Sequence, residues 1–127
     1  MKFRPVPTLL AALLAASPIA AHDAAAQDVA AGGAMFAEQC SNCHGVTAGD
    51  NGTGPTLAGI VGAPAGHVAG FNYSPAMKAY GKIWNDAALD AYLANPRAAV
   101  PGTRMKLGGI ADPDDRANLI AYLKTLH

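Results

Sequence analysis

Two cysteines and a histidine stand close together in this chain, as Cys40, Cys43 and His44, and the sequence contains no other cysteine. Thiols three positions apart on a helical turn share a face. Both can therefore add to the two vinyl groups of one haem and form two thioether bonds. The imidazole of His44 would then lie beside the porphyrin plane, where one ring nitrogen can bind the iron. A C-x-x-C-H sequence is typical of c-type haem attachment.

Other interpretations of this motif have less support. A redox dithiol of the thioredoxin type is expected in a βαβ setting, and this chain has no convincing strand pattern. A structural zinc site needs four ligands, usually from paired motifs, and no second pair follows in the sequence. A short motif can also arise by chance. Haem attachment is therefore the leading hypothesis, and the rest of the chain has to support it.

Length and composition favour one small domain with a cofactor. The chain has 127 residues, with 14 glycines and 9 prolines, which indicates a single domain. A mature part of about 100 residues buries only roughly 60–70% of its unfolded surface, so a large apolar cofactor would supply missing buried area. The formal net charge of zero does not indicate a nucleic-acid partner.

The first 26 residues resemble a secretory signal segment. Lys2 and Arg4 form a basic start, the run from Leu9 to Ala16 is apolar, and Ala24–Ala26 fits an A-x-A cleavage signal. The alternative is an uncleaved anchor, but the apolar run is shorter than the ~20 residues that span a bilayer. We therefore expect export and cleavage after Ala26, leaving residues 27–127 as the mature domain.

The mature part is predicted to be all-α. Asp28 can cap a first helix, which carries four residues on one face at helical spacing: Val29, Gly32, Phe36 and Cys40. This helix is expected to continue to His44 and to stop at Gly45.

Residues 45–72 have eight glycines and no convincing periodicity. A loop of this length is unusual in a compact domain, but it is reasonable where the chain wraps a cofactor.

Three further helices are predicted from their end signals. Ser74-Pro75 begins a short one that ends at Gly81. Asn85 caps the next, which ends before Pro96 because a residue that precedes proline is pushed out of the helical region. The last begins at Asp112-Pro113, and its apolar stripe comprises Leu119, Ile120, Leu123 and Leu126.

Several motifs together, with their spacings, resemble the class I c-type cytochromes of the soluble mitochondrial and bacterial kind. These are Cys40–His44, Gly54–Leu57, Phe71–Ser74, Trp84 and Pro101–Met105. The resemblance covers residues 28–126. It implies the cytochrome c fold, with about four or five helices and long loops wrapped around one covalently bound haem.

The resemblance also implies which residues hold the cofactor. Cys40 and Cys43 would carry the thioethers of a single haem c, and His44 would be the proximal ligand of its iron. Met105 would be the distal ligand. The carbonyl of Pro55 would accept a hydrogen bond from the ring N–H of His44. This bond would fix the orientation of the ring and raise the basicity of its other nitrogen.

Further residues would support the cofactor from other elements. Tyr73 and Trp84 would donate hydrogen bonds to a buried haem propionate. Tyr92 would sit against the Met105 side of the haem, and Thr103 would support the loop that carries Met105. Gly32 and Phe36 of the first helix would pack against Leu119 and Tyr122 of the last.

Three positions depart from the family pattern. Ala63 stands where many relatives have an arginine near the inner propionate, Met77 replaces an asparagine, and Leu107 replaces an aromatic residue. Met77 and Met35, on predicted helices, are expected to fill space rather than to bind iron. The departures leave the proposed ligands unchanged but affect the potential and the docking contacts.

The resemblance implies a soluble periplasmic electron carrier and no catalytic residue. Its partners would be transient redox donors and acceptors, including peripheral contact with membrane-bound respiratory complexes, and we expect a monomer. One alternative is a dedicated haem subunit of a periplasmic dehydrogenase. Another is a small haem peroxidase, although the chain has no evident distal acid–base histidine. A docking face is predicted where five basic residues gather: Lys78, Lys82, Arg97, Arg104 and Lys106.

Overall fold

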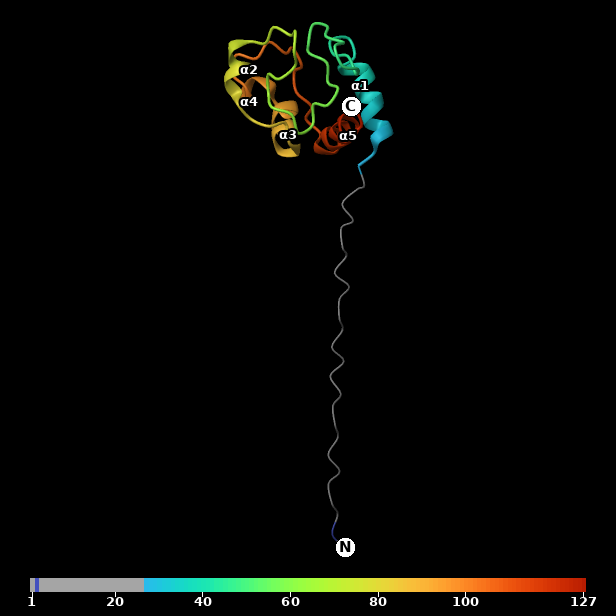
Figure 1. Cartoon of the computed structure of the whole chain (residues 1–127). Helices are drawn as coiled ribbons and strands as arrows, with labels where there is room; N and C mark the ends of the chain where they lie inside the picture. The colour runs from blue at the N-terminus through green and yellow to red at the C-terminus, as the bar shows by residue number, and fades with distance from the viewer. Residues whose placement is uncertain (1, 3–26) are drawn as a thin grey trace.

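The computed structural model describes Lys2 and residues 27–127. The predicted signal segment, residues 1–26, therefore lies outside the described residues apart from Lys2. In the described part the regular secondary structure is helical, and no helix there is long and apolar enough to cross a membrane. The helices, shown in Figure 1, are α1 (Val29–Gln39), α2 (Pro75–Tyr80), α3 (Asp86–Ala94), α4 (Pro96–Ala99) and α5 (Pro113–Leu123).

The first and last helices pack against each other (Figure 1), and this is the most extensive helix–helix contact. A Cβ atom on Gly32 would overlap the carbonyl oxygen of Asn118, so only glycine allows this approach. The Phe36 and Tyr122 rings lie 5.3 Å apart between centroids. The backbone N–H of Asp28 donates to the Asn118 side chain at 2.8 Å. The predicted packing of α1 on α5 is therefore confirmed.

Helix α1 ends before the two cysteines, so the prediction that it continues to His44 is wrong. The backbone N–H groups of Cys40 and Ser41 both donate to the carbonyl of Phe36, at 2.9 and 3.0 Å. The Ser41 hydroxyl donates to the Ala37 carbonyl at 2.7 Å. This side-chain bond competes with the regular helical ladder. The chain then forms a turn in which the N–H of His44 donates to the carbonyl of Cys40 at 3.0 Å.

The predicted starts of α2 and α3 are confirmed by their caps. The Ser74 hydroxyl accepts from the N–H of Met77 at 3.1 Å, and the Asn85 side chain accepts from the N–H of Ala88 at 2.8 Å. Each bond satisfies an amide that has no partner inside its helix. Helix α2 ends at Gly81, as predicted.

Helix α4 was not predicted. Asn95 ends α3 in an extended conformation, and its side chain then accepts from the N–H of Ala98 at 3.2 Å. Pro96 occupies the first position of α4, where its missing N–H costs nothing, and its side chain is fully buried. One asparagine thus both ends a helix and begins the next, which turns the chain toward the segment after Val100.

Helix α5 begins at its predicted cap, Asp112, and is joined to α3 by two ion pairs. The Arg116 guanidinium lies 2.7 Å from a carboxylate oxygen of Asp90 and also donates to the carbonyl of Ile110 at 2.8 Å. The Lys124 ammonium pairs with Asp86 at 2.8 Å, but both side chains are well exposed. The Arg116 contacts hold the segment before α5 against α3.

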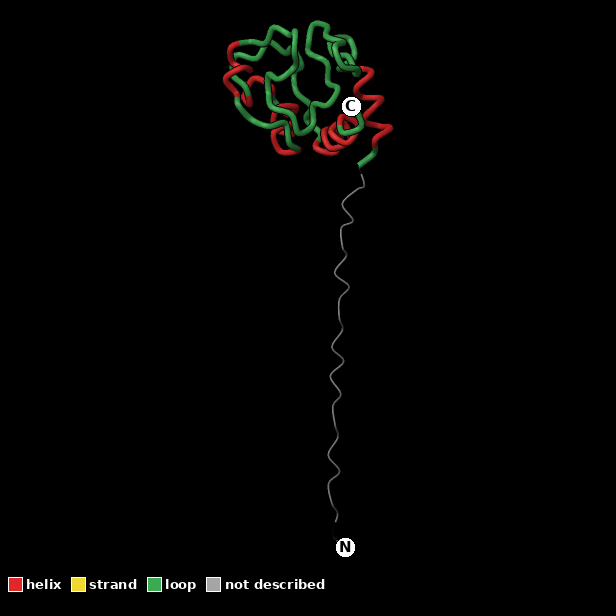
Figure 2. Tube along the Cα trace, in the orientation of Figure 1, coloured by secondary structure: helices red, strands yellow, loops and turns green. Residues whose placement is uncertain are grey.

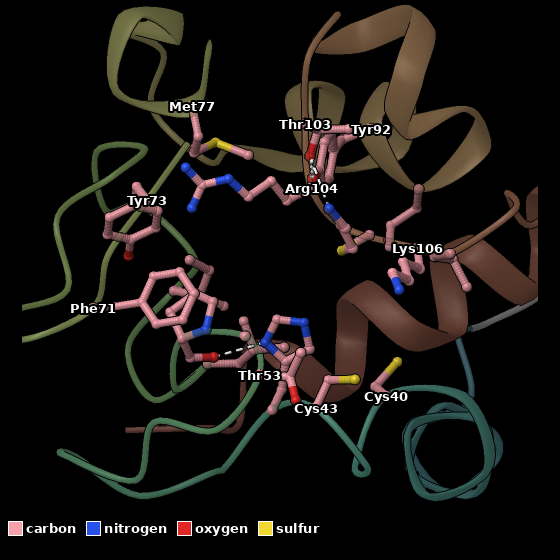
Figure 3. A pocket seen from close by; sticks show the side chains of 18 of the residues that line it. Cys40, Cys43, Thr53, Phe71, Tyr73, Met77, Tyr92, Thr103, Arg104 and Lys106 are labelled. Carbon is pink, nitrogen blue, oxygen red and sulfur yellow. Dashed lines mark hydrogen bonds between the residues drawn. The ribbon is translucent and has the colours of Figure 1, made fainter. Parts of the chain in front are cut away.

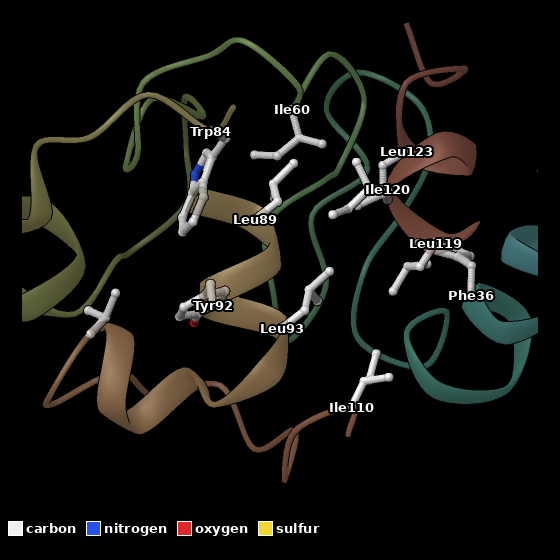
Figure 4. Close-up of a cluster of buried hydrophobic side chains, with 11 residues drawn as sticks. Phe36, Ile60, Trp84, Leu89, Tyr92, Leu93, Ile110, Leu119, Ile120 and Leu123 are labelled. Carbon is white, nitrogen blue, oxygen red and sulfur yellow. The ribbon is translucent and has the colours of Figure 1, made fainter. Parts of the chain in front are cut away.

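The long loop between α1 and α2 is confirmed (Figure 2). Two backbone hydrogen bonds connect it to the segment before α3. The N–H of Trp84 donates to the carbonyl of Ala63 at 2.9 Å, and the N–H of Gly62 donates to the carbonyl of Trp84 at 2.9 Å. The main cluster of buried apolar residues comes from α1, α3, α5 and the loops, as Figure 4 shows, and has eleven members. They are Phe36, Ile60, Trp84, Leu89, Tyr92, Leu93, Val100, Ile110, Leu119, Ile120 and Leu123.

Candidate functional site

A cavity of about 830 Å³ opens beside this core. The turn Cys40–His44 forms one wall and the segment Thr103–Lys106 forms the opposite wall, as Figure 3 shows. The cavity lies in the upper part of the size range of cofactor sites, about 300–1,000 Å³. It is lined by all nine residues that the sequence analysis placed at the cofactor: Cys40, Cys43, His44, Pro55, Tyr73, Trp84, Tyr92, Thr103 and Met105.

The thiols of Cys40 and Cys43 are free and lie together at one end of the cavity (Figure 3). Burial raises the pKa of the Cys40 thiol to about 11, and the neighbouring Cys43 adds to the shift. Catalytic dithiols of the thioredoxin type have a lowered pKa, because the thiolate is the reactive form. The environment of Cys40 is therefore unlike that of a catalytic dithiol.

The ring of His44 is held in the form that a metal ligand requires. Its Nδ1 atom lies 2.7 Å from the carbonyl oxygen of Pro55, and because a carbonyl can only accept, Nδ1 carries the proton. Burial lowers the pKa of His44, and the bond to Pro55 opposes this in part. The ring is therefore neutral, and its Nε2 lone pair is free to bind iron. A Cβ atom on Gly54 would overlap this ring, so Gly54 shapes the space that His44 occupies.

The Met105 segment is supported by a polar chain that starts on α3. The Tyr92 and Thr103 hydroxyl oxygens lie 2.7 Å apart, and Thr103 accepts from the N–H of Met105 at 3.3 Å (Figure 3). Burial raises the pKa of Tyr92, while the bond to Thr103 lowers it in part. The loop that carries Met105 is thus anchored by neutral hydroxyl groups.

Tyr73 and Trp84 are buried and line the cavity, and Tyr73 lies at the end away from Cys40 (Figure 3). The Tyr73 hydroxyl accepts from the N–H of Val68 at 3.1 Å, so its own proton remains available for a ligand. The Trp84 indole stacks at a tilt between Tyr80 and Tyr92, with centroid distances of 5.4 and 5.1 Å. These contacts fix two donor groups in the lining of the cavity.

The structure also brings Met77 to the cavity, where the sequence analysis had expected only a space-filling residue. Met35, by contrast, packs against the core and does not line the cavity. Thr53, from the glycine-rich loop, lines the wall near Cys43 (Figure 3). No periodic pattern marks Thr53, because this loop has no regular structure that could give one.

The loop itself is organised by two residues that sequence reasoning did not single out for a role. The Asn51 side chain accepts from the N–H of Thr56 at 2.9 Å and donates to the carbonyl of Ala69 at 3.2 Å. The buried Thr56 hydroxyl donates to the carbonyl of Thr47 at 2.6 Å. The only signal for Thr56 is its place in the Gly54–Leu57 motif.

The residues present fit a haem. The turn with two free thiols and one neutral imidazole faces the segment that carries one thioether, and the donor Tyr73 lies at the end away from Cys40 (Figure 3). Between these groups the lining is mainly aliphatic, with Leu57, Ile60, Leu89, Leu93, Leu119 and Leu123. An apolar macrocycle with two polar carboxylates on one edge matches this distribution.

Comparison with known proteins agrees with this arrangement. The family model described as cytochrome c matches residues 29–127. Cytochrome c2 from Rhodomicrobium vannielii is 50% identical over 105 residues, which cover 81% of this chain and 82% of the relative. Cytochrome c2 iso-2 from Magnetospirillum fulvum is 46% identical over 87 residues, covering 68% and 91%. The solved structure of cytochrome cH from Methylobacterium extorquens superposes with a TM-score of 0.72 at 47% identity, covering 77% of this chain and 98% of its own.

The match extends over most of the described residues and includes the C-x-x-C-H motif. The fold, the cavity and the paired thiols are those that this family uses to hold its cofactor covalently. The chain therefore belongs to the cytochrome c family and carries one haem c attached through Cys40 and Cys43.

Proposed function

We propose that this chain is a soluble periplasmic electron carrier whose iron is bound by His44 and Met105. When bound, haem c supplies one iron that accepts or releases a single electron. The observation that carries this proposal is the arrangement of one cavity: a neutral imidazole oriented by Pro55 on one wall and the Met105 segment anchored by Thr103 on the other. The two residues would fill both axial positions.

This ligand set has functional consequences. A thioether favours ferrous iron, so His/Met ligation gives a higher potential than harder ligands do. The aliphatic lining excludes water from the site and acts in the same direction. Because neither His44 nor Met105 has to leave for electron transfer, little of the protein needs to rearrange. With both positions filled, small molecules are kept from the metal.

Other residues hold the cofactor in place. Tyr73 has a free hydroxyl proton beside its bond from Val68, and we assign this proton and the Trp84 indole N–H to one propionate. Burial raises the pKa of Tyr73, although the bond from Val68 opposes this, so the phenol stays protonated and can donate. Tyr92 and Thr103 keep the Met105 loop closed over the cavity.

The mature protein is proposed to be residues 27–127, exported by the segment 1–26. Its partners would be redox proteins that donate or accept one electron in transient contacts, including membrane-bound respiratory complexes met at the membrane surface. We propose a monomer with no enzymatic activity. The peroxidase alternative requires Met105 to dissociate, and the Thr103 anchor opposes this.

The test is a steady-state assay with the purified, haem-loaded protein. Candidate electron donors are a quinol–cytochrome c oxidoreductase and periplasmic dehydrogenases. A free carrier is expected to be reduced and reoxidised at catalytic turnover without co-purifying with an enzyme. Stable co-purification with one dehydrogenase would support the subunit alternative. Rapid binding of cyanide or hydrogen peroxide at neutral pH would support the peroxidase alternative. Either result contradicts the proposal.

A further inference from the structure

The charges that line the cavity are of one sign. Among the lining residues the charged side chains are Arg104 and Lys106, and no aspartate or glutamate takes part. A haem carries two carboxylates, its propionates, so any positive charge that compensates them must come from the protein. An ionised carboxylate at a largely apolar site needs a partner charge or several hydrogen-bond donors. Both side chains are exposed at the mouth of the cavity, and one of the two cations is therefore expected to reach the cofactor.

The two cations lie at opposite ends of the cavity. The Lys106 ammonium lies on the side of Cys40, whereas the Arg104 side chain extends toward Tyr73 and Met77 (Figure 3). In a haem the vinyl groups that form thioethers and the propionates lie on opposite sides of the macrocycle. Since Cys40 and Cys43 fix the vinyl side, the propionates must point to the end where Arg104 and Tyr73 are found.

The guanidinium of Arg104 is held at this end by the backbone. Its Nη1 atom donates to the carbonyl of Asn72 at 3.3 Å, next to Tyr73 in the chain. A guanidinium has five N–H donors in a planar fork. This single bond therefore leaves two parallel N–H groups free to bind a carboxylate. Ala63, which is bonded to Trp84 through the backbone, adds no charge here.

We propose that Arg104 is a haem-binding residue, and that its guanidinium is the charge partner of the propionate that Tyr73 also contacts. Under this proposal Arg104 serves the cofactor rather than the predicted docking face. The inference rests on the proposed assignment of Tyr73 and Trp84 to the propionate end. It gives the Met105 segment a second task, because one loop then supplies both an iron ligand and a propionate partner.

The other titratable groups on the cavity are accounted for. Burial raises the pKa of Tyr73 and of Tyr92, so both phenols stay neutral between pH 5 and 8. The cysteines are consumed by the thioethers, and His44 is fixed by its bond to Pro55. The guanidinium lowers the propionate pKa, because it favours the charged form. In the parent protein the propionate is therefore expected to remain ionised, and the reduction potential should not change with pH across this range.

The test compares Arg104→Gln with Lys106→Gln, two variants that each remove one positive charge from the same loop. In haem-loaded Arg104→Gln the propionate pKa should rise into the measured range. Reduction adds negative charge and raises this pKa further, so proton uptake accompanies reduction. The reduction potential should then fall as pH rises between about 5 and 8. Lys106→Gln should shift the potential without adding a slope.

A second readout is the infrared redox-difference spectrum of protein whose haem propionates carry ¹³C-labelled carboxyl groups. A labelled carboxyl band should change in Arg104→Gln and not in Lys106→Gln. If both variants keep a flat pH profile, or acquire the same slope and the same infrared bands, Arg104 is not the propionate partner. The proposed carrier function is tested separately, since the turnover assay and the iron spectrum of the parent protein do not depend on this comparison.

Discussion

The hydroxyl oxygens of Tyr92 and Thr103 lie 2.7 Å apart, which links α3 directly to the loop that carries Met105. Thr103 also accepts from the N–H of Met105 at 3.3 Å. One threonine hydroxyl thus connects a buried helix residue to the backbone of the proposed iron ligand.

Thr103→Val is therefore predicted to loosen this loop. Valine has nearly the same shape but leaves the Tyr92 hydroxyl and the Met105 amide without their partner, which costs about 1–3 kcal/mol. The free energy of unfolding should fall by that amount, and the ferric protein should bind imidazole several-fold more tightly. Thr103→Ser, which keeps a hydroxyl, is the control and should stay close to the parent. Equal imidazole affinity in both variants would exclude this role for the hydroxyl.

Gly54→Ala is predicted to displace the His44 ring, because a Cβ atom there would overlap it. Overpacking of this kind costs about 1–3 kcal/mol, and the ferric spectrum should lose part of its low-spin signal. The control is Gly49→Ala. Gly49 has a φ of 81° and nothing within 4 Å of an added Cβ, so this change adds backbone strain of about 1–2 kcal/mol and no overlap. A normal spectrum in Gly54→Ala would show that the ring is not confined as described.

Stability is predicted to fall at alkaline pH through Tyr92. Burial raises the pKa of this phenol above its usual value of 10.0, so the folded state holds the proton more firmly than the unfolded chain does. The contribution is fully present below pH 10 and is lost as pH rises toward the folded-state pKa. The slope is at most about 1.4 kcal/mol per pH unit for one group. Urea midpoints measured from pH 8 to 11.5 should fall less steeply for Tyr92→Phe than for the parent. Parallel curves would contradict this assignment.

A fourth prediction concerns docking. Four exposed basic residues remain for this role once Arg104 is assigned to the cofactor: Lys78, Lys82, Arg97 and Lys106. Lys106 stands at the edge of the cavity. Charges at the rim of an interface mainly change the association rate and its salt dependence, over a screening length of about 8 Å at physiological ionic strength.

Lys106→Glu is expected to slow association with the redox partner and to flatten the dependence of the rate on salt. Lys124→Glu, on α5, is the control and should have little effect on association. Its exposed pair with Asp86 is worth at most about 1 kcal/mol of stability. The measurement is the association rate of each variant with the redox partner, by stopped flow across a series of ionic strengths. If the association rates of both variants depend on ionic strength in the same way, the basic face is not the docking site.

The sequence predicted those features that depend on local chemistry. The caps at Ser74, Asn85 and Asp112 are confirmed, because each side chain bonds to an amide two or three residues further along. Spacing placed Gly32 and Phe36 on one face of α1, and the family resemblance implied that this face packs against α5.

The features that were missed depend on contacts that leave no periodic signal. Where α1 ends, the Ser41 hydroxyl donates a hydrogen bond to the Ala37 carbonyl. The sequence does not show whether a serine makes such a bond. Helix α4 begins at its cap, Asn95, whereas in the sequence Asn95-Pro96 indicates only the end of α3. The bond from Arg104 to the carbonyl of Asn72 also has no sequence signal, because the two residues are brought together only in the folded chain.

The central claim is that Met105, and not another methionine, completes the iron coordination opposite His44. Met77 lines the same cavity from α2, so it is the appropriate comparison. The most direct measurement is the ferric absorption and electron paramagnetic resonance spectrum of Met105→Ala beside that of Met77→Ala, in protein that retains covalent haem. We predict that Met105→Ala becomes high-spin or takes an external ligand, with a lowered potential and new peroxidase activity, while Met77→Ala stays low-spin. The opposite pattern, with Met105→Ala low-spin and unchanged in potential, would contradict the ligand assignment.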